Sequence, residues 1–174
     1  LIDILRLYEL WYLIYQSSKL NDGVYLEVGA YKGGSSIIIG SALNEFNINK
    51  KLFIADTFDG VAKASSKDNK YIGGEHKFTD IDFIIKNLNK NNIENFEILK
   101  GVFPDFNSKK IKDKIRFIHI DVDTYKSAQD IVEWSYTKLV NNGLIIFDDY
   151  GFIGCEGITK LCEEYEKDNR FIFF

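Results

Sequence analysis

Carboxylates cluster in two short segments in the second half of the chain. Residues 121–125 read Asp-Val-Asp-Thr-Tyr, and residues 148–150 read Asp-Asp-Tyr. Oxygen-only side chains of this kind suit a hard cation such as Mg²⁺, which keeps several waters and accepts substrate oxygens. Acidic groups this close together would repel one another strongly without a cation. We therefore predict a divalent-metal site formed by Asp121, Asp148 and Asp149, with helix caps and solvated loop ends as the alternative.

A glycine-bearing turn marks a second potential binding site nearer the N-terminus. Residues 27–36 read Glu-Val-Gly-Ala-Tyr-Lys-Gly-Gly-Ser-Ser. Glycines at a strand-to-helix turn let the backbone approach a ligand, and the following helix offers free N–H groups. Tyr31 stands where a dinucleotide fingerprint would have its second glycine, so a nicotinamide enzyme is disfavoured. The turn alone is a weak signal, because a plain tight turn explains it equally well.

Asp56 follows directly on the next apolar run, residues 52–55. An acidic residue at this place accepts both hydroxyls of a ribose in nucleotide-binding doubly wound folds. The alternative is an exposed loop carboxylate or a helix cap. In combination with the glycine turn, Asp56 predicts a ligand that contains a nucleoside.

These residues must be positioned by alternating strands and helices. Apolar runs predict buried strands at 24–28, 52–55, 96–99, 115–120 and 144–147, with a final strand beginning at Phe171. Helical spacing and caps predict helices at 1–15, 35–46, 81–88 after the N-cap Asp80, 127–140 after the cap Ser127, and 156–167. Residues 141–143 (Asn-Asn-Gly) predict a turn, and residues 57–79 a long functional loop.

Fully apolar strands that alternate with helices predict an α/β fold: a doubly wound, mostly parallel sheet with helices on both faces. Ligands bind such sheets at the carboxyl ends of the strands. Nearly every predicted strand is followed there by a glycine or a carboxylate, namely Gly29, Asp56, Gly101, Asp121 and Asp148. The glycine turn and the acidic segments are therefore expected to meet at one edge of the sheet.

Length and composition predict one domain over residues 1–174, with an N-terminal helix in 1–20 and a Rossmann-like core in 23–174. The net charge of −4 gives no basic footprint for nucleic acid, and no run of residues is apolar enough to span a membrane. Cys155 and Cys162 are expected to be reduced and buried, as in a cytoplasmic protein. The N-terminal helix is expected either to cover the sheet or to contact a second subunit in a homo-oligomer.

The two ends of the chain suggest a fragment of a longer protein. The chain begins at Leu1 and contains no methionine, and its last residues, 171–174, read Phe-Ile-Phe-Phe. We expect residues to precede Leu1 and the final strand to be cut short.

Four motifs together resemble the macrocin O-methyltransferase family over residues 23 to about 165. They are Glu-x-Gly-x-x-x-Gly at 27–33, Ala-Asp-Thr-Phe-Asp-Gly at 55–60, Ile-Asp-Val-Asp-Thr-Tyr-Lys-Ser at 120–127 and Phe-Asp-Asp-Tyr-Gly at 147–151. The resemblance implies a class I methyltransferase fold, S-adenosylmethionine as methyl donor, and Mg²⁺ or another divalent cation near the acceptor. It further implies that the acceptor is a hydroxyl of a sugar or of a glycosylated small molecule.

The resemblance also assigns roles to residues of this chain. It places the donor among Glu27, Gly29, Tyr31, Gly33, Ser35, Ser36, Asp56, Phe58, Gly101 and Asp121. The metal would be held by Asp121 and Asp148, with Asp149 as a third ligand or hydrogen-bonded to one. Asp121 and Asp123 would belong to the catalytic centre, where Asp123 and Tyr125 would shape the site. The general base stays open: His76 in the long loop is a candidate because histidine titrates near neutrality, and Lys126 and Asp123 are further options. His119, inside a predicted strand, is expected to be a hydrogen-bonded core residue.

Three other readings remain open at this stage. Asp121-Val-Asp123-Thr124 matches the Asp-x-Asp-x-Thr motif of haloacid-dehalogenase-type phosphatases, in which the first Asp is the nucleophile. That motif normally follows the first strand, whereas here it follows the fourth. The same residues would suit the metal site of a glycosyltransferase. The chain would alternatively be a methyltransferase fold that binds its ligand without turnover.

Overall fold

Five parallel strands form a single sheet in a computed structural model that describes residues 3–168 and 170–173. The strands are β1 (Val24–Val28), β2 (Leu52–Asp56), β3 (Phe96–Lys100), β4 (Ile115–Ile120) and β5 (Leu139–Phe147). Their order in the sheet is β3-β2-β1-β4-β5, so the chain reverses its direction of progress between β1 and β4. This arrangement confirms the predicted doubly wound fold and places a topological switch point at the centre of the sheet.

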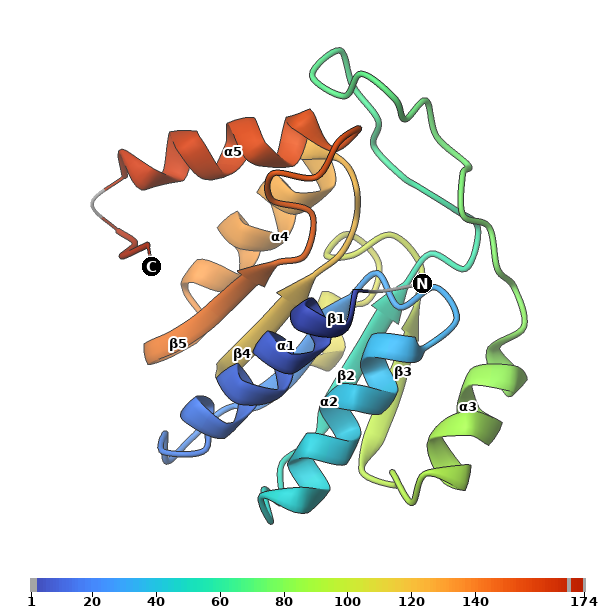
Figure 1. Ribbon diagram of the computed structural model, residues 1–174, viewed down its shortest axis with the longest axis vertical. Coiled ribbons are helices and arrows are strands. Elements are labelled where there is room, and N and C mark those ends of the chain that lie inside the picture. The colour runs from blue at the N-terminus through green and yellow to red at the C-terminus, as the bar shows by residue number, and fades with distance from the viewer. Residues whose placement is uncertain (1–2, 169, 174) are drawn as a thin grey trace.

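Helices cover both faces of the sheet (Figure 1). Alternate residues of each strand face opposite sides, so that Tyr25 and Phe117 belong to one core and Leu26 and Ile118 to the other. The first core is closed by α1 (Ile4–Ser17), α2 (Gly34–Glu45) and α3 (Ile81–Lys90). The second core is closed by α4 (Tyr125–Tyr136) and α5 (Glu156–Glu166).

The helix predicted at 127–140 lies at 125–136, and Ser127 is not its cap. The N-cap is Thr124, and the first helical N–H, that of Tyr125, donates to Oδ1 of Asp68 at 2.8 Å. Asp68 belongs to the long loop and is buried. A carboxylate from a distant segment therefore replaces the expected local cap, and it fastens the loop to α4.

Two other predicted elements differ from the structure near the C-terminus. The turn predicted at 141–143 lies inside β5, where the register with β4 shifts between the pairs Ile115–Leu139 and Phe117–Leu144. Its residues form a bulge, with Asn142 in the left-handed region at φ 62°. Residues 171–173 pair with no strand of the sheet; the Phe171 ring packs instead against Tyr136 of α4 and Tyr165 of α5. Residue 174 lies outside the described residues, as do residues 1 and 2 of the predicted N-terminal helix.

The N-terminal helix α1 covers the sheet, which is one of the two arrangements predicted for it. Leu10 and Ile14 are buried in the first core, while Leu5 and Tyr8 face solvent.

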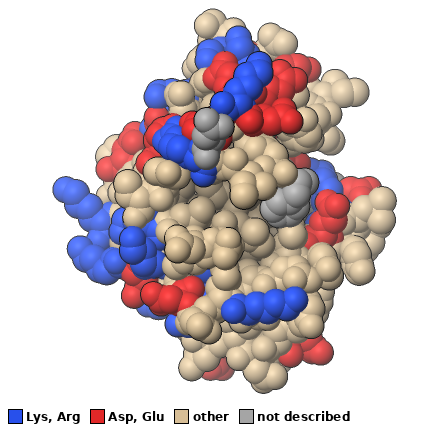
Figure 2. Space-filling model, turned by 90° about the vertical axis from the view of Figure 1, so that its left-hand side faces the viewer, with Lys and Arg blue, Asp and Glu red and all other residues tan. Residues whose placement is uncertain are grey.

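No helix in the described part of the chain is long and apolar enough to cross a membrane. Cys155 and Cys162 are buried free thiols, as predicted. On the face that carries the free edge of β5, basic and acidic side chains surround an uncharged central area (Figure 2).

Arg116 on β4 ties α1 to the sheet. Its guanidinium is buried and donates to the carbonyl oxygens of Gly23 at 2.9 Å and Ser17 at 3.4 Å, and it lies 5.7 Å from the Tyr25 ring centre. Ser17 lies at the end of α1, so this contact sets where the helix meets the sheet. The anchored helix in turn places Arg6, near its N-terminus, at the carboxyl ends of the strands, beside Asp148.

Replacing Arg116 with alanine is expected to lower the free energy of unfolding by about 2–4 kcal/mol. The change removes the guanidinium hydrogen bonds to the carbonyls of Gly23 and Ser17, of which the Ser17 carbonyl keeps the Leu20 amide as a donor, and it removes a packed aliphatic stem. Urea unfolding monitored by circular dichroism measures the effect. Lys114→Ala is the matched control, since this exposed side chain also donates to a carbonyl, that of Thr137. A loss below about 0.5 kcal/mol for Arg116→Ala, the level typical of surface substitutions, would contradict the anchoring role.

Candidate active site

A cavity of about 340 Å³ opens at the carboxyl edge of the sheet. The ends of β1, β4 and β5 form its floor, and the loop at 57–79 contributes one wall through Thr57, Val61, Lys70, Tyr71 and His76. The switch point between β1 and β4 therefore opens into a cavity large enough for a small-molecule ligand. The loop that was predicted to be functional therefore borders the cavity.

The glycine turn lets the ends of β1 and β4 meet almost backbone to backbone. Gly29 has φ +95°, and a side chain at this position would overlap the carbonyl oxygen of Asp121. The amide of Asp121 donates to Val28 at 2.9 Å, and the amide of Gly29 donates to Ala55 at 2.8 Å. Only glycine satisfies both the dihedral angle and the close approach at this position.

Asp56 at the end of β2 holds the turn in place. Its Oδ2 accepts hydrogen bonds from the amides of Ala30 and Tyr31, both at 2.8 Å, and its Oδ1 accepts one from Phe58 at 2.7 Å. A carboxylate has about four acceptor sites, so one remains for a ligand. Asp56 also lines the cavity, where it is available to a hydroxyl group.

The structure brings half of the predicted donor residues to the cavity. Gly29, Tyr31, Asp56, Gly101 and Asp121 line it. The cavity lining does not include Glu27, Gly33, Ser35, Ser36 or Phe58.

The predicted donor residues away from the cavity have structural surroundings. Strand alternation turns Glu27 toward α2, where its fully buried carboxylate accepts a hydrogen bond from the Ser36 hydroxyl. Phe58 adopts φ 54° and inserts its ring into the first core. Ser35 is buried, and Gly33 is the N-cap of α2, against Ile84. These residues support the glycine turn from the side away from the cavity.

The predicted metal residues converge at the ends of β4 and β5. Asp121, Asp148 and Asp149 each offer one oxygen, and these oxygens lie within 4.8 Å of one another. Burial, and then the charge of Asp149, raise the pKa of Asp121 well above its usual value. Burial, and then the charge of Asp123, raise the pKa of Asp149 to about 6. Three crowded carboxylates, of which Asp121 and Asp149 have raised pKa values, fit a site that binds a hard cation.

Asp148 differs from its neighbours because two cationic side chains hold it. Arg6 of α1 forms an ion pair with Oδ2, and His119 Nε2 lies 3.4 Å from Oδ1. Burial disfavours the Asp148 carboxylate, but the His119 hydrogen bond and the charges of His119 and Arg6 outweigh it and lower the pKa. Burial likewise disfavours charged His119, yet hydrogen bonds to Asp148 and Glu27 raise its pKa to about 10. His119 is thus the hydrogen-bonded core residue that was predicted.

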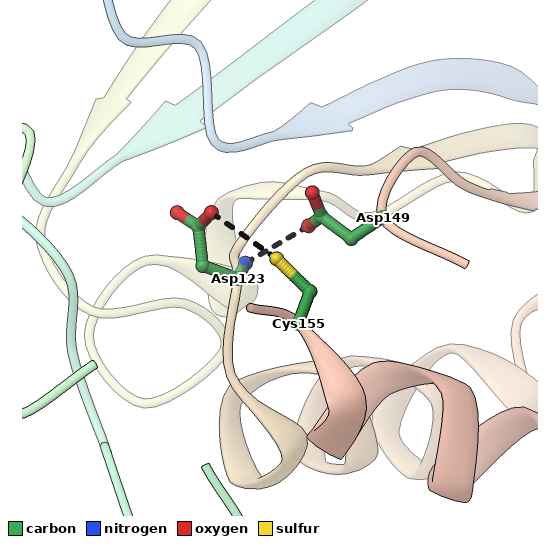
Figure 3. Close-up of side chains that lie close together, drawn as sticks. All are labelled: Asp123, Asp149 and Cys155. Carbon is green, nitrogen blue, oxygen red and sulfur yellow. Dashed lines mark hydrogen bonds between the residues drawn. The ribbon is translucent and has the colours of Figure 1, made fainter. Parts of the chain in front are cut away.

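Asp123 lies beside the triad and faces Cys155, the N-cap of α5 (Figure 3). The Asp123 amide donates to Oδ2 of Asp149 at 3.0 Å, and its own Oδ1 lies 3.8 Å from the Cys155 sulfur. The Tyr71 hydroxyl lies 4.0 Å from the same sulfur. Burial, and then the charges of Asp149 and Asp123, raise the pKa of the Cys155 thiol to about 12. The Asp123 carboxylate lines the cavity, where it can meet an acceptor.

His76 reaches the cavity from the long loop, as predicted. Its Nε2 lies 3.5 Å from the Tyr71 hydroxyl, and its ring packs edge-on against Tyr31 at 5.9 Å. Other residues at the cavity were not predicted, and they include Arg6, Lys70, Tyr71, Phe103 and Phe152. No local motif identifies them, because they come from helices and loops whose positions depend on the whole fold.

Relatives of known activity support a common family. A protein from Micromonospora griseorubida described as mycinamicin III 3''-O-methyltransferase is 24% identical over 153 residues, which are 79% of this chain and 60% of that protein. A Streptomyces olivaceus protein described as 8-demethyl-8-(2,3-dimethoxy-alpha-L-rhamnosyl)-tetracenomycin-C 4'-O-methyltransferase is 25% identical over 169 residues, 89% of this chain and 64% of that protein. The chain therefore spans less than two thirds of either relative.

Solved structures support the fold. The O-methyltransferase NovP superposes with a TM-score of 0.79 at 22% identity, covering 92% of this chain and 70% of NovP. An O-methyltransferase from Bacillus cereus in complex with SAH gives a TM-score of 0.64 at 18% identity, covering 97% and 71%. The profile of the macrocin-O-methyltransferase (TylF) family matches residues 13–172, which is nearly the whole chain. This chain belongs to the macrocin-O-methyltransferase (TylF) family.

Proposed function

We propose that this protein transfers a methyl group from S-adenosylmethionine to a hydroxyl of a sugar or of a glycosylated small molecule, with a divalent cation bound beside the acceptor. The observation that carries the proposal is a single cavity lined by both Asp56 and the carboxylates of Asp121, Asp148 and Asp149. Two relatives support the acceptor class, since one is described as a methyltransferase of mycinamicin III and the other as a methyltransferase of a rhamnosyl-tetracenomycin.

The donor would occupy the part of the cavity between the glycine turn and the end of β3. Asp56 is placed to accept a ribose hydroxyl, and Gly29 and Gly101 line the same part of the cavity directly after β1 and β3. S-adenosylmethionine supplies an activated methyl group on its sulfonium. The chain's contribution is to hold donor and acceptor in line, because positioning accounts for much of the acceleration of such displacements.

The acceptor would lie beside Asp121 and Asp123. The three crowded carboxylates fit Mg²⁺ in ligand type. Asp121 and Asp149, which form no ion pair with another described residue, would be its main ligands. A bound Mg²⁺ would lower the pKa of the acceptor hydroxyl. Asp123 is placed to take the proton, since its carboxylate lines the same cavity; His76 on the loop is the second candidate.

The phosphatase alternative accounts for fewer of the observations. It would use Asp121 as a nucleophile and Asp123 as acid or base, but it gives no role to the Gly29 turn or to the Asp56 carboxylate. The family match and the position of Asp121 on the fourth strand also favour methyl transfer.

Replacing Asp56 with alanine is expected to weaken S-adenosylmethionine binding by about 10- to 100-fold. The change removes a charge-assisted hydrogen bond to the ribose and releases the amides of Ala30 and Tyr31. Isothermal calorimetry with S-adenosylmethionine measures the effect. Asp59→Ala is the matched control, because Asp59 is an exposed carboxylate three residues further along the same loop. Equal affinities of the two variants for S-adenosylmethionine would contradict the assignment of Asp56 to the donor site.

A further inference from the structure

Asp123, Asp149 and Cys155 form a second group of potential metal ligands next to the triad. One atom from each residue lies within 4.8 Å of the other two. Figure 3 shows the Cys155 thiol directed at the two carboxylates from the start of α5. The group shares Asp149 with the triad but differs from it in chemistry, because one of its ligands is sulfur.

We propose that this cluster binds a thiophilic divalent cation such as Zn²⁺ or Cd²⁺, at a position distinct from the Mg²⁺ site. Sulfur ligands favour such ions, whereas carboxylate-only sites favour Mg²⁺. In a tetrahedral zinc site the sulfur and a carboxylate oxygen lie roughly 3.5 Å apart, given metal–ligand distances of about 2.3 and 2.1 Å. The Cys155 sulfur lies 3.8 Å from Oδ1 of Asp123, so this pair is already close to the spacing of a zinc site.

Charge and burial also fit a bound cation at this cluster. Asp149 is 5% exposed and Cys155 1% exposed, and both are directed into the cluster. Among the ion pairs of the described residues none includes Asp149 or Asp123, whereas Asp148 next door has both Arg6 and His119. The Asp149 carboxylate accepts a hydrogen bond from the Asp123 amide, and a bound cation would balance its charge as well.

A metal ion can enter and leave through the cavity, which Asp123 and Asp149 both line. On binding, the Cys155 S–H bond breaks, a sulfur–metal bond forms and the proton passes to solvent. Because Asp149 belongs to both groups, the thiophilic ion and Mg²⁺ are expected to compete. Only this competition rests on the proposed function; binding of the thiophilic ion does not.

Titration with Cd²⁺ tests the inference, because cadmium thiolates absorb in the ultraviolet through charge transfer. The wild-type protein is expected to develop this band with one equivalent of Cd²⁺, and excess Mg²⁺ is expected to weaken apparent Cd²⁺ binding. Cys155→Ser should abolish the band. Asp123→Asn should weaken Cd²⁺ binding at least tenfold, as loss of a metal ligand does.

Cys162→Ser is the matched control, since Cys162 is the other buried free thiol and lies away from the carboxylates. It should leave the band unchanged. A band that survives in Cys155→Ser, one that is lost in Cys162→Ser, or no band in folded wild-type protein would overturn the inference. Calorimetry with S-adenosylmethionine on the same samples keeps the two proposals apart, because donor binding without a cadmium band contradicts only the cation site.

Discussion

Gly29→Ala is expected to abolish S-adenosylmethionine binding and to lower the free energy of unfolding by more than about 3 kcal/mol. A residue with a side chain at φ +95° is strained by about 1–3 kcal/mol, and the added carbon would also overlap the Asp121 carbonyl. The ends of β1 and β4 would have to separate, which moves Asp121 away from the glycine turn. Urea unfolding and donor calorimetry measure the two effects.

Gly34→Ala provides a matched control for this substitution. Gly34 is the first residue of α2, has no positive φ, and has nothing within 4 Å of an added side-chain carbon. Alanine there should leave donor binding intact and change stability by less than about 1 kcal/mol, in the stabilising direction. If Gly29→Ala behaved like Gly34→Ala, the close approach of the two strands would not be needed for the site.

Asp121→Asn is expected to weaken binding of Mn²⁺, used as a probe for Mg²⁺, at least about tenfold, since even residues that only support a ligand change metal affinity 10- to 100-fold. The same substitution should maintain or raise the stability of the metal-free protein. It relieves repulsion within the triad, because burial and the charge of Asp149 already disfavour the Asp121 carboxylate and raise its pKa. Electron paramagnetic resonance of Mn²⁺ reports the affinity, and thermal unfolding in chelator reports the stability.

The two readouts separate a ligand from a structural residue. A residue needed only for folding would lose stability together with metal affinity. Asp113→Asn, at an exposed carboxylate away from the cavity, should change neither quantity. Unaltered Mn²⁺ affinity in Asp121→Asn would contradict the triad.

The sequence alone predicted the sheet and the edge at which the site lies. Strand ends are readable because each buried run stops at a glycine or a carboxylate, and parallel strands bring those ends together. Gly29, Asp56 and Asp121 were placed at the cavity by this reasoning. The same reasoning put Asp148 beside Asp121, since both follow strands that turned out to be neighbours.

Side-chain direction and long-range partners were not predictable in the same way. Strand alternation places Glu27 on the same side of β1 as Tyr25, facing α2, and this direction could have been predicted. The motif comparison instead predicted that Glu27 contacts the donor, because it precedes the glycine turn. Phe58 points inward because its backbone adopts a left-handed conformation that no local pattern marks. The contacts of Arg6 with Asp148 and of Asp68 with α4 join distant segments, so they follow only from the completed fold.

The most direct test of the account is calorimetric titration of the wild-type protein with S-adenosylmethionine, with NAD⁺ as a comparison ligand. Binding of S-adenosylmethionine with a dissociation constant on the order of micromolar, about −8 kcal/mol, and no detectable binding of NAD⁺ is the predicted result. Thermal unfolding of the same sample establishes that the protein is folded. A folded protein that does not bind S-adenosylmethionine would contradict the assignment of the cavity as a methyl-donor site.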